Sequence, residues 1–247
     1  MIPLKSKEEL EMLKVSGKIL AKVMKKIQEF VKPGITTAQI NQLAEGLILN
    51  EGALPAFKGY RCFPASVCTS LNEEIVHGIP GERKLKEGDI ISLDLGINYK
   101  NYFSDAAVTL AIGRVSSEVK KLIEVTKKSL SEGIRQAKVN NNLSDISYSI
   151  QNYVEKNGFS VVRQFVGHGI GLSLHEEPEI PNFGKAHLGP VLKSGMVLAI
   201  EPMVNMGTWE SEMLENGWTA VTKDRLPSAH FEHTVAITDR GPEILTN

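Results

Sequence analysis

The sequence has few cysteines, almost no net charge and no long apolar run. These three features argue against a disulfide framework, a strongly charged partner and a membrane-spanning helix, respectively. Its 247 residues include two cysteines, Cys62 and Cys68, which form no CxxC pair. This spacing predicts reduced thiols rather than a disulfide framework. The apolar runs are much shorter than the ~20 residues that a membrane-spanning helix needs.

The charge balance and the amino-terminal residues set expectations about partners and location. With 28 basic and 29 acidic side chains, the formal net charge is −1. So small a charge gives no strong field, which argues against nucleic-acid specificity and against an acidic membrane as a partner. Residues 1–5 lack the basic region and the apolar run of a signal peptide. We therefore expect a soluble, cytoplasmic protein, with a monomer as the default.

The chain does contain enough apolar residues, 42%, for one full core, and we expect a single domain over residues 1–247. A capping box at Ser6 and Glu9 begins a helix whose apolar seam runs to residue 31. The seam is open to two interpretations, a coiled coil or packing on the chain's own sheet, and a glycine within it favours the second. Further helices are expected after Thr36, Ser116 and Ser144.

Two decamers match at an offset of 107 positions. Residues 85–94 read Leu-Lys-Glu-Gly-Asp-Ile-Ile-Ser-Leu-Asp, and residues 192–201 read Leu-Lys-Ser-Gly-Met-Val-Leu-Ala-Ile-Glu. Each follows a pair of predicted helices, so an internal duplication is expected, with pseudo-repeats of roughly 1–110 and 111–247. This pattern predicts an α+β fold in which helices back a curved, mainly antiparallel sheet. A site between the halves is favoured, because each repeat presents a strand that ends in an acid.

Asp94 and Asp105 lie in two apolar strands, predicted over residues 90–95 and 102–112, on either side of a turn-like segment, 98–101. A symmetric hairpin makes them direct cross-strand partners with Cβ atoms ~4.5–5.5 Å apart. Two facing carboxylates are destabilising unless cations lie between them, and a metal pair spaced ~3.5–4 Å suits the gap. The alternative is a solvated hairpin with two exposed acids.

Three further side chains extend this set. Glu201 and Glu232 each lie in an otherwise apolar, strand-like run, where an unpaired carboxylate costs several kcal/mol. His168 lies between two glycines that allow close approach of the backbone, although a lone histidine is also typical of a satisfied core position. Four carboxylates and one imidazole suit Mn(II), Fe(II), Co(II) or Zn(II), and the four negative charges balance two such ions.

Several short motifs resemble the type I methionine aminopeptidases, a family with the pita-bread fold, and the likeness runs over essentially the whole chain. The motifs are Ser66-Val-Cys68, Asn72-Glu-x-x-x-His77-Gly-Ile-Pro80, Gly88-Asp-Ile-Ile-x-x-Asp94, Gly167-His-Gly-Ile-Gly171, His175-Glu-Glu-Pro178, Glu201-Pro-Met203, Gly217-Trp-Thr219 and Phe231-Glu-His-Thr234.

This resemblance implies a dinuclear metallo-aminopeptidase that removes the N-terminal methionine from peptides and nascent proteins and prefers a small second residue. Transient contact with the ribosome is left open. The chain's own Ile2 is bulky, so we expect Met1 to be retained. The implied ligands of the two divalent ions (Co, Mn, Fe or Zn) are Asp94, Asp105, His168, Glu201 and Glu232, with Asp94 and Glu232 as bridges.

The resemblance also implies the residues that act on the substrate. His77 and His175 match two histidines that act without binding metal, and Glu201 is the expected proton shuttle. The pocket for the methionine side chain is a mainly aromatic slot suited to a flexible thioether. The substrate-binding set is Phe57, Tyr60, Phe63, Cys68, His77, His175 and Trp218.

Some positions depart from the family pattern, and two rival functions remain. Leu174 stands where some relatives carry phenylalanine, His230 where many carry glutamine, and Ser104 where glycine is frequent. The first departure could reshape the pocket, and the second could alter the surroundings of Glu232. The rivals are a proline-specific dipeptidase on the same fold and a non-catalytic binding protein.

Overall fold

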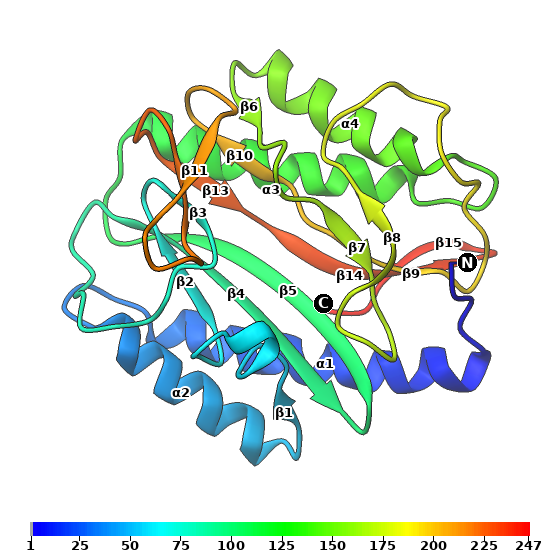
Figure 1. Cartoon of the computed structure of the whole chain (residues 1–247), viewed down its shortest axis with the longest axis horizontal. Coiled ribbons are helices and arrows are strands. Elements are labelled where there is room, and N and C mark those ends of the chain that lie inside the picture. Colours follow the sequence, from blue (N-terminus) through cyan, green and yellow to red (C-terminus); the bar gives the residue numbers. More distant parts are fainter. Residues whose placement is uncertain (1) are drawn as a thin grey trace.

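The computed structural model describes residues 2–247, with a curved sheet backed by two pairs of helices (Figure 1). One pair is α1 (Lys7–Phe30) and α2 (Thr37–Asn50), and the other is α3 (Ser117–Gln136) and α4 (Leu143–Lys156). A short 3₁₀ helix, η1, covers Tyr60–Cys62. Within the described part of the chain, no helix combines the length and hydropathy needed to cross a bilayer.

The main sheet has nine strands, and every pairing in it is antiparallel. Its order is β1-β4-β5-β14-β9-β7-β8, with β2 paired to β4 and β15 paired to β14. This architecture confirms the expected α+β pita-bread fold. The strand bounds are β1 (Leu54–Pro55), β2 (Cys68–Leu71), β4 (Ile90–Tyr99), β5 (Tyr102–Ala111), β7 (Gly167–Gly169), β8 (Glu176–Ile180), β9 (Val197–Ile200), β14 (Glu232–Thr238) and β15 (Gly241–Ile244).

Two small three-stranded sheets complete the fold beside the main sheet. Their strand orders are β13-β10-β6 and β11-β12-β3. Both carry residues to the cavity or its margin, so they matter for the site. Their strands are β3 (Glu74–Val76), β6 (Ser160–Val161), β10 (Met203–Asn205), β11 (Ser211–Met213), β12 (Ala220–Thr222) and β13 (Ser228–His230).

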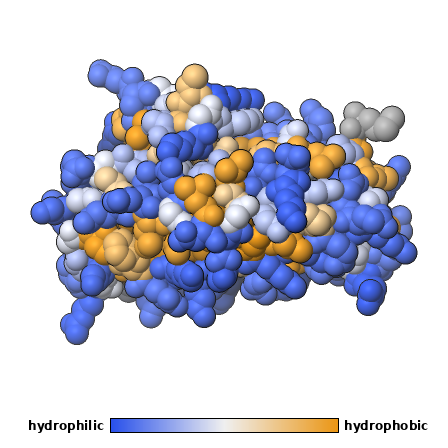
Figure 2. Space-filling model, turned by 90° about the horizontal axis from the view of Figure 1, so that it is seen from below, coloured by the Kyte–Doolittle hydropathy of each residue, from blue (hydrophilic) through white to orange (hydrophobic). Residues whose placement is uncertain are grey.

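Helix α1 forms as the sequence predicts, and its apolar seam packs on the chain's own sheet. The Ser6 hydroxyl accepts the Glu9 N–H, and the Glu9 carboxylate accepts the Ser6 N–H, which satisfies free donors at the helix start. The seam contacts β4 and β5. Gly17 is required there, because a Cβ would lie 2.2 Å from the Leu245 carbonyl oxygen. On the face seen from this side, hydrophilic side chains lie mainly along the margins and hydrophobic ones gather across the middle (Figure 2).

Helix α4 begins two residues before the position predicted from Ser144, and that prediction was wrong. Asn142 is the N-cap, and its N–H donates to the Asp145 carboxylate at 2.8 Å. The Ser144 hydroxyl instead accepts the N–H of Leu188. Two cap-forming residues compete here, and the reciprocal bond of Asp145 selects Asn142.

The two predicted repeats adopt matching local structure. Gly88 and Gly195 have φ angles of 92° and 93°, and β4 and β9 each begin two residues later. The residue before each second helix also bridges to the turn before its strand, Thr36 to Lys84 and Asn142 to Val191. The same helix-to-turn contact therefore occurs twice. The repeat boundaries at about residue 110 stay a prediction.

The β4–β5 hairpin has a different register from the one predicted. Asp94 lies opposite Ala107, and Asp105 lies opposite Gly96, so the two aspartates are diagonal neighbours rather than direct partners. The strands continue to Tyr99 and Tyr102, and the turn consists of two residues, 100 and 101, both with positive φ. Because the register differs by an even number of residues, both carboxylates still face the same side of the sheet.

Alternation along β4 separates the core from the site. Ile91, Leu93 and Leu95 are fully buried in the apolar cluster beneath α1 and α2. Asp94 lies between them in sequence and therefore faces the other side. A second cluster joins α3 and α4 to β9 and β14 in the same way. Each helix pair thus covers one half of the sheet and leaves the opposite face free for polar side chains.

Candidate metal centre and substrate pocket

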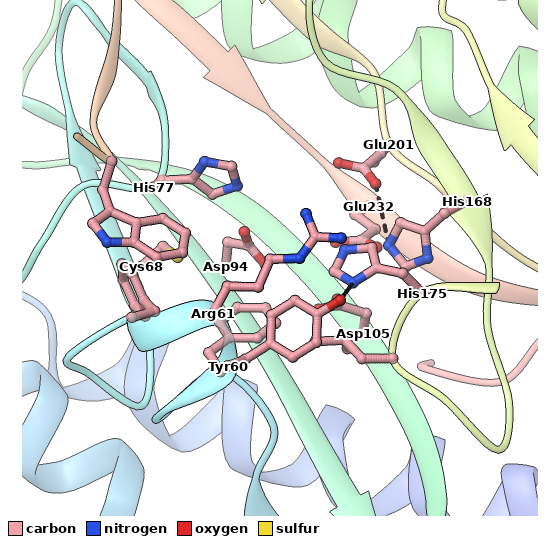
Figure 3. A pocket seen from close by; sticks show the side chains of 14 residues that line it. Tyr60, Arg61, Cys68, His77, Asp94, Asp105, His168, His175, Glu201 and Glu232 are labelled. Atoms are coloured by element: carbon pink, nitrogen blue, oxygen red, sulfur yellow. Dashed lines mark hydrogen bonds and ion pairs between the residues drawn. The ribbon is translucent and has the colours of Figure 1, made fainter. Parts of the chain in front are cut away.

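One cavity on the open face of the sheet gathers all 12 side chains that were predicted for the site (Figure 3). Two more residues, Arg61 and Leu174, line it as well. Residues separated by up to 175 positions therefore share one space. The lining consists of Phe57, Tyr60, Arg61, Phe63, Cys68, His77, Asp94, Asp105, His168, Leu174, His175, Glu201, Trp218 and Glu232.

The five predicted metal ligands come from five strands that are consecutive in the sheet. The strands are β4, β5, β14, β9 and β7. Four of the side chains lie within their strands, and Glu201 directly follows the last residue of β9. The open face of the sheet therefore holds the five side chains on a rigid surface. In strand order they are Asp94, Asp105, Glu232, Glu201 and His168.

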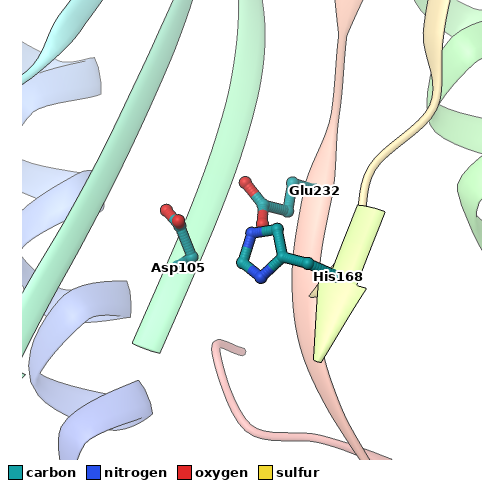
Figure 4. A group of neighbouring side chains, drawn as sticks. All are labelled: Asp105, His168 and Glu232. Carbon is teal, nitrogen blue, oxygen red and sulfur yellow. The ribbon is translucent and has the colours of Figure 1, made fainter. Parts of the chain in front are cut away.

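Two groups of three side chains have the spacing of metal ligands. Asp105, His168 and Glu232 offer atoms within 4.8 Å of one another (Figure 4). Glu201, His230 and Glu232 form a second group with the same limit. Glu232 belongs to both groups. Asp94 belongs to neither, although it lines the same cavity.

Burial changes the protonation of these groups. Desolvation, together with the charge of Glu201, raises the pKa of Asp94 to about 7. Burial also raises the pKa values of Asp105, Glu201 and Glu232 well above their ordinary range. Burial lowers the pKa of His168 to about 3, which keeps its imidazole neutral. Such carboxylates ionise together only when cations neutralise them.

Several buried polar atoms at the site lack a hydrogen-bond partner. Within residues 2–247, no partner reaches Asp94 Oδ1, Glu232 Oε1 or either ring nitrogen of His230. Buried polar atoms normally have partners, so these atoms are available for a cation. Oxygen atoms with neutral imidazole nitrogens are the donors that a divalent transition metal prefers. The residues present therefore fit a bound divalent metal.

The two further histidines lie beside this acidic cluster. The Nδ1 of His175 lies 2.8 Å from the Tyr60 hydroxyl, and the two rings stack with centroids 5.1 Å apart. Burial and the charge of Arg61 lower the pKa of His175. His77 has a left-handed backbone, with a φ of 60°, and its ring meets the edge of Trp218. Burial lowers the pKa of His77 to about 4.

An apolar slot adjoins the carboxylates. Phe63 meets Trp218 edge to face, with ring centroids 5.1 Å apart. The Asn216 side chain accepts the backbone N–H of Trp218 and so fixes its loop. Leu174 is buried and lines the cavity, so the side chain at this position contributes to the shape of the wall.

Arg61 is a site residue that sequence reasoning missed. Its backbone is left-handed, with a φ of 47°, and the same is true of Cys62. Left-handed geometry usually accompanies glycine, and no glycine marks these two positions. The position of Arg61 between two predicted pocket residues, Tyr60 and Phe63, was the available signal.

Comparison with known proteins agrees with this geometry. The model of metallopeptidase family M24 matches residues 11–239. A methionine aminopeptidase of Clostridium perfringens is 53% identical over 100% of this chain and 99% of its own length. Methionine aminopeptidase 1 of Bacillus subtilis is 51% identical over the same shares of both chains.

Solved structures of methionine aminopeptidases are also similar to this chain. Methionine aminopeptidase from Thermotoga maritima superposes with a TM-score of 0.98 at 44% identity, and each chain is covered completely. A prolidase from Pyrococcus horikoshii has a TM-score of 0.81 at 22% identity, and this chain covers 63% of it, which shows a shared fold alone. The chain therefore belongs to metallopeptidase family M24, and within it to the type I methionine aminopeptidases.

Proposed function

We propose that this metallo-aminopeptidase removes the N-terminal methionine from peptides and nascent proteins with two divalent metal ions bound in the cavity. The observation that carries the proposal is the convergence of five potential ligands from five consecutive strands on one face of the sheet. A single catalytic domain of two pseudo-repeats forms this face. A monomeric, cytoplasmic enzyme that meets new chains at the ribosome suits the activity.

The proposed ligands are the four carboxylates and His168. Glu232 is the best candidate for a bridge, because it belongs to both groups with metal-ligand spacing. Two bound ions would supply Lewis acidity and lower the pKa of water to near neutrality. The donor set suits Mn, Fe, Co or Zn. Asp94 is proposed as the second bridge.

The chain's own side chains would handle protons and orient the substrate. Glu201 would carry a proton from the attacking water to the leaving amine. When Tyr60 donates to Nδ1 of His175, the neutral ring keeps its proton on Nε2 and can donate it to the scissile carbonyl oxygen. The neutral ring of His77 would donate a second hydrogen bond near the scissile bond.

The apolar slot would select methionine. A thioether side chain is flexible and packs favourably on aromatic rings, which Phe57, Phe63 and Trp218 supply. Cys68 and Tyr60 would close the slot. We expect peptides with a small second residue to be preferred.

The test compares Asp94→Ala with a control, Asp239→Ala, which removes an exposed aspartate in the turn that follows β14. We expect the Asp94 variant to bind less metal by elemental analysis and to cleave Met-Ala-Ser at least about 100-fold more slowly. The control should match the unchanged protein in both measurements. Full activity of the Asp94 variant without bound metal would refute the proposal.

A second assay separates this function from that of a proline-specific dipeptidase. The metal-loaded protein should hydrolyse Met-Ala-Ser and leave Ala-Pro intact. Faster hydrolysis of Ala-Pro would favour the dipeptidase. No hydrolysis of either peptide by protein with two bound ions would favour a binding protein.

A further inference from the structure

His230 is a buried histidine beside the proposed metal centre, outside the five ligands that the family resemblance implies. It ends β13 and is 1% exposed. Thr109 fixes its backbone from both sides, because the Thr109 hydroxyl accepts the His230 N–H and donates to the His230 carbonyl, each at 2.8 Å. The ring is therefore held by a rigid backbone.

Both nitrogens of this ring are unsatisfied. No atom of residues 2–247 lies in hydrogen-bonding position to Nδ1 or Nε2 of His230. A neutral imidazole has one donor and one acceptor, and leaving both without partners in a protein interior is costly. The two unpaired nitrogens therefore indicate that this ring binds a ligand that is not part of the protein.

Distances to Glu201 indicate what that ligand is. Nε2 of His230 lies 3.5 Å from Oε2 of Glu201, and Nε2 of His168 lies 3.6 Å from Oε1 of the same carboxylate. Both separations exceed those of an N–H···O hydrogen bond, about 2.7–3.2 Å. Two atoms that each bind one ion at about 2.0–2.2 Å lie about 3.0–3.5 Å apart at tetrahedral or octahedral angles. The spacing suits two ligands of a common ion better than a hydrogen bond.

We infer that His230 is a sixth protein ligand of the metal centre. His230 would share one divalent ion with Glu201 and Glu232, and the other proposed ligands, Asp94 included, would keep their roles. The inference rests on the proposed dinuclear function and adds a second imidazole to it. A second imidazole among the ligands favours Co(II), Fe(II) and Zn(II) over Mn(II) relative to a site with fewer nitrogen ligands.

The test uses Co(II) as the probe and compares His230→Gln with His230→Ala. Glutamine can still donate a hydrogen bond to Glu201 but is a weak ligand for these metals, so the two variants separate ligation from hydrogen bonding. His187→Gln is the matched control, because the side chain of His187 is 85% exposed. Melting temperatures establish that each variant is folded.

X-ray absorption should count two imidazoles per two cobalt ions in the unchanged protein and one in His230→Gln. Titration should show about 10-fold or greater loss of affinity for one of the two ions in both His230 variants. The control should keep the full count and both affinities.

Retention of the imidazole count and both affinities in His230→Gln would overturn the inference. A count of one imidazole in the unchanged protein would overturn it as well, and this measurement does not depend on whether a variant folds. Binding of two ions with only one imidazole would leave the proposed function intact. Failure of the unchanged protein to bind cobalt or manganese would instead count against the proposed function.

Discussion

Lys5 and Glu176 form an ion pair that supports the segment carrying His175. Lys5 Nζ lies 2.5 Å from Glu176 Oε2, and 3% of the lysine side chain is exposed. Oε1 of Glu176 accepts the N–H groups of Leu172 and Ser173. The amino-terminal segment thus fixes a loop at the edge of the cavity, 171 residues further along the chain.

Replacement of Lys5 should weaken both stability and catalysis. Lys5→Met leaves a mostly buried carboxylate without its cation, and we expect a loss of about 1–3 kcal/mol in the free energy of unfolding. Denaturant unfolding and steady-state kinetics on Met-Ala-Ser would measure the effects. Lys5→Arg should restore part of kcat, and Lys18→Met, at an exposed position, should change neither quantity. An unchanged kcat in a destabilised Lys5→Met would show that the pair does not position His175.

Gly96 should control the position of Phe57. A Cβ at residue 96 would lie 2.6 Å from a ring carbon of Phe57, so Gly96→Ala must displace this wall of the slot. We expect KM for Met-Ala-Ser to rise about 10-fold, with a smaller change in kcat, because uniform binding of the methionine side chain is lost. Gly46→Ala is the control, since nothing lies within 4 Å of its Cβ, and it should add about 0.5–1 kcal/mol of stability. Equal kinetics in both variants would contradict the assignment of Phe57.

Loss of the Tyr60 hydroxyl should impair His175. Tyr60→Phe keeps the stacked ring and removes the 2.8 Å hydrogen bond to Nδ1. A bond worth about 0.5–1.5 kcal/mol corresponds to a roughly 2- to 12-fold fall in kcat. Metal content should not change, which separates this effect from damage to the metal centre. A kcat equal to that of the unchanged protein would show that Tyr60 does not set the orientation of His175.

Metal uptake should release protons. Burial raises the pKa of Asp94 to about 7 and raises the pKa values of Asp105, Glu201 and Glu232 as well, so the metal-free protein holds protons that ligation displaces. Calorimetric titration in two buffers of different ionisation enthalpy should detect more than one proton per pair of ions at pH 7. Asp94→Asn should release fewer.

The same raised pKa values set the sign of the pH dependence. In the metal-free protein, they contribute stability below the ordinary carboxylate pKa of about 4, and this contribution is lost as pH rises through the raised values. Bound metal neutralises the ionised carboxylates, so the metal-loaded protein does not lose this stability as pH rises. The difference in Tm between metal-loaded and chelated protein should therefore widen from pH 5 to pH 8. A constant difference would contradict the assignment of the carboxylates as ligands.

Local signals were sufficient for the positions of most elements and for the four candidate acids, whereas the residues of the substrate pocket were predicted only from the family resemblance. The capping box at Ser6 predicted α1. The position of four acids within apolar strands predicted that they face a cation, and these acids are Asp94, Asp105, Glu201 and Glu232. Because strand side chains alternate, any acid in a strand with a buried opposite face must point to the open side. This is why the carboxylates meet even though the predicted hairpin register was wrong.

Features that depend on tertiary context could not be predicted. The β4–β5 turn is formed by Lys100 and Asn101, and no glycine indicates their positive φ angles. Likewise, no glycine indicates the left-handed backbone of Arg61. The pairing of Lys5 with Glu176 joins residues that no local pattern relates. Competition between Asn142 and Ser144 as caps was decided by one bond from Asp145.

Strand β14 lies between β5 and β9 in the sheet, yet it is among the last elements in the order of synthesis. Translation must therefore pass residue 232 before the two halves can be joined. A chain that stalls earlier would leave two unpaired strand edges exposed, which are common starting points for aggregation. Glu232 arrives with the same strand, so assembly of the sheet and the appearance of peptidase activity should coincide during biosynthesis.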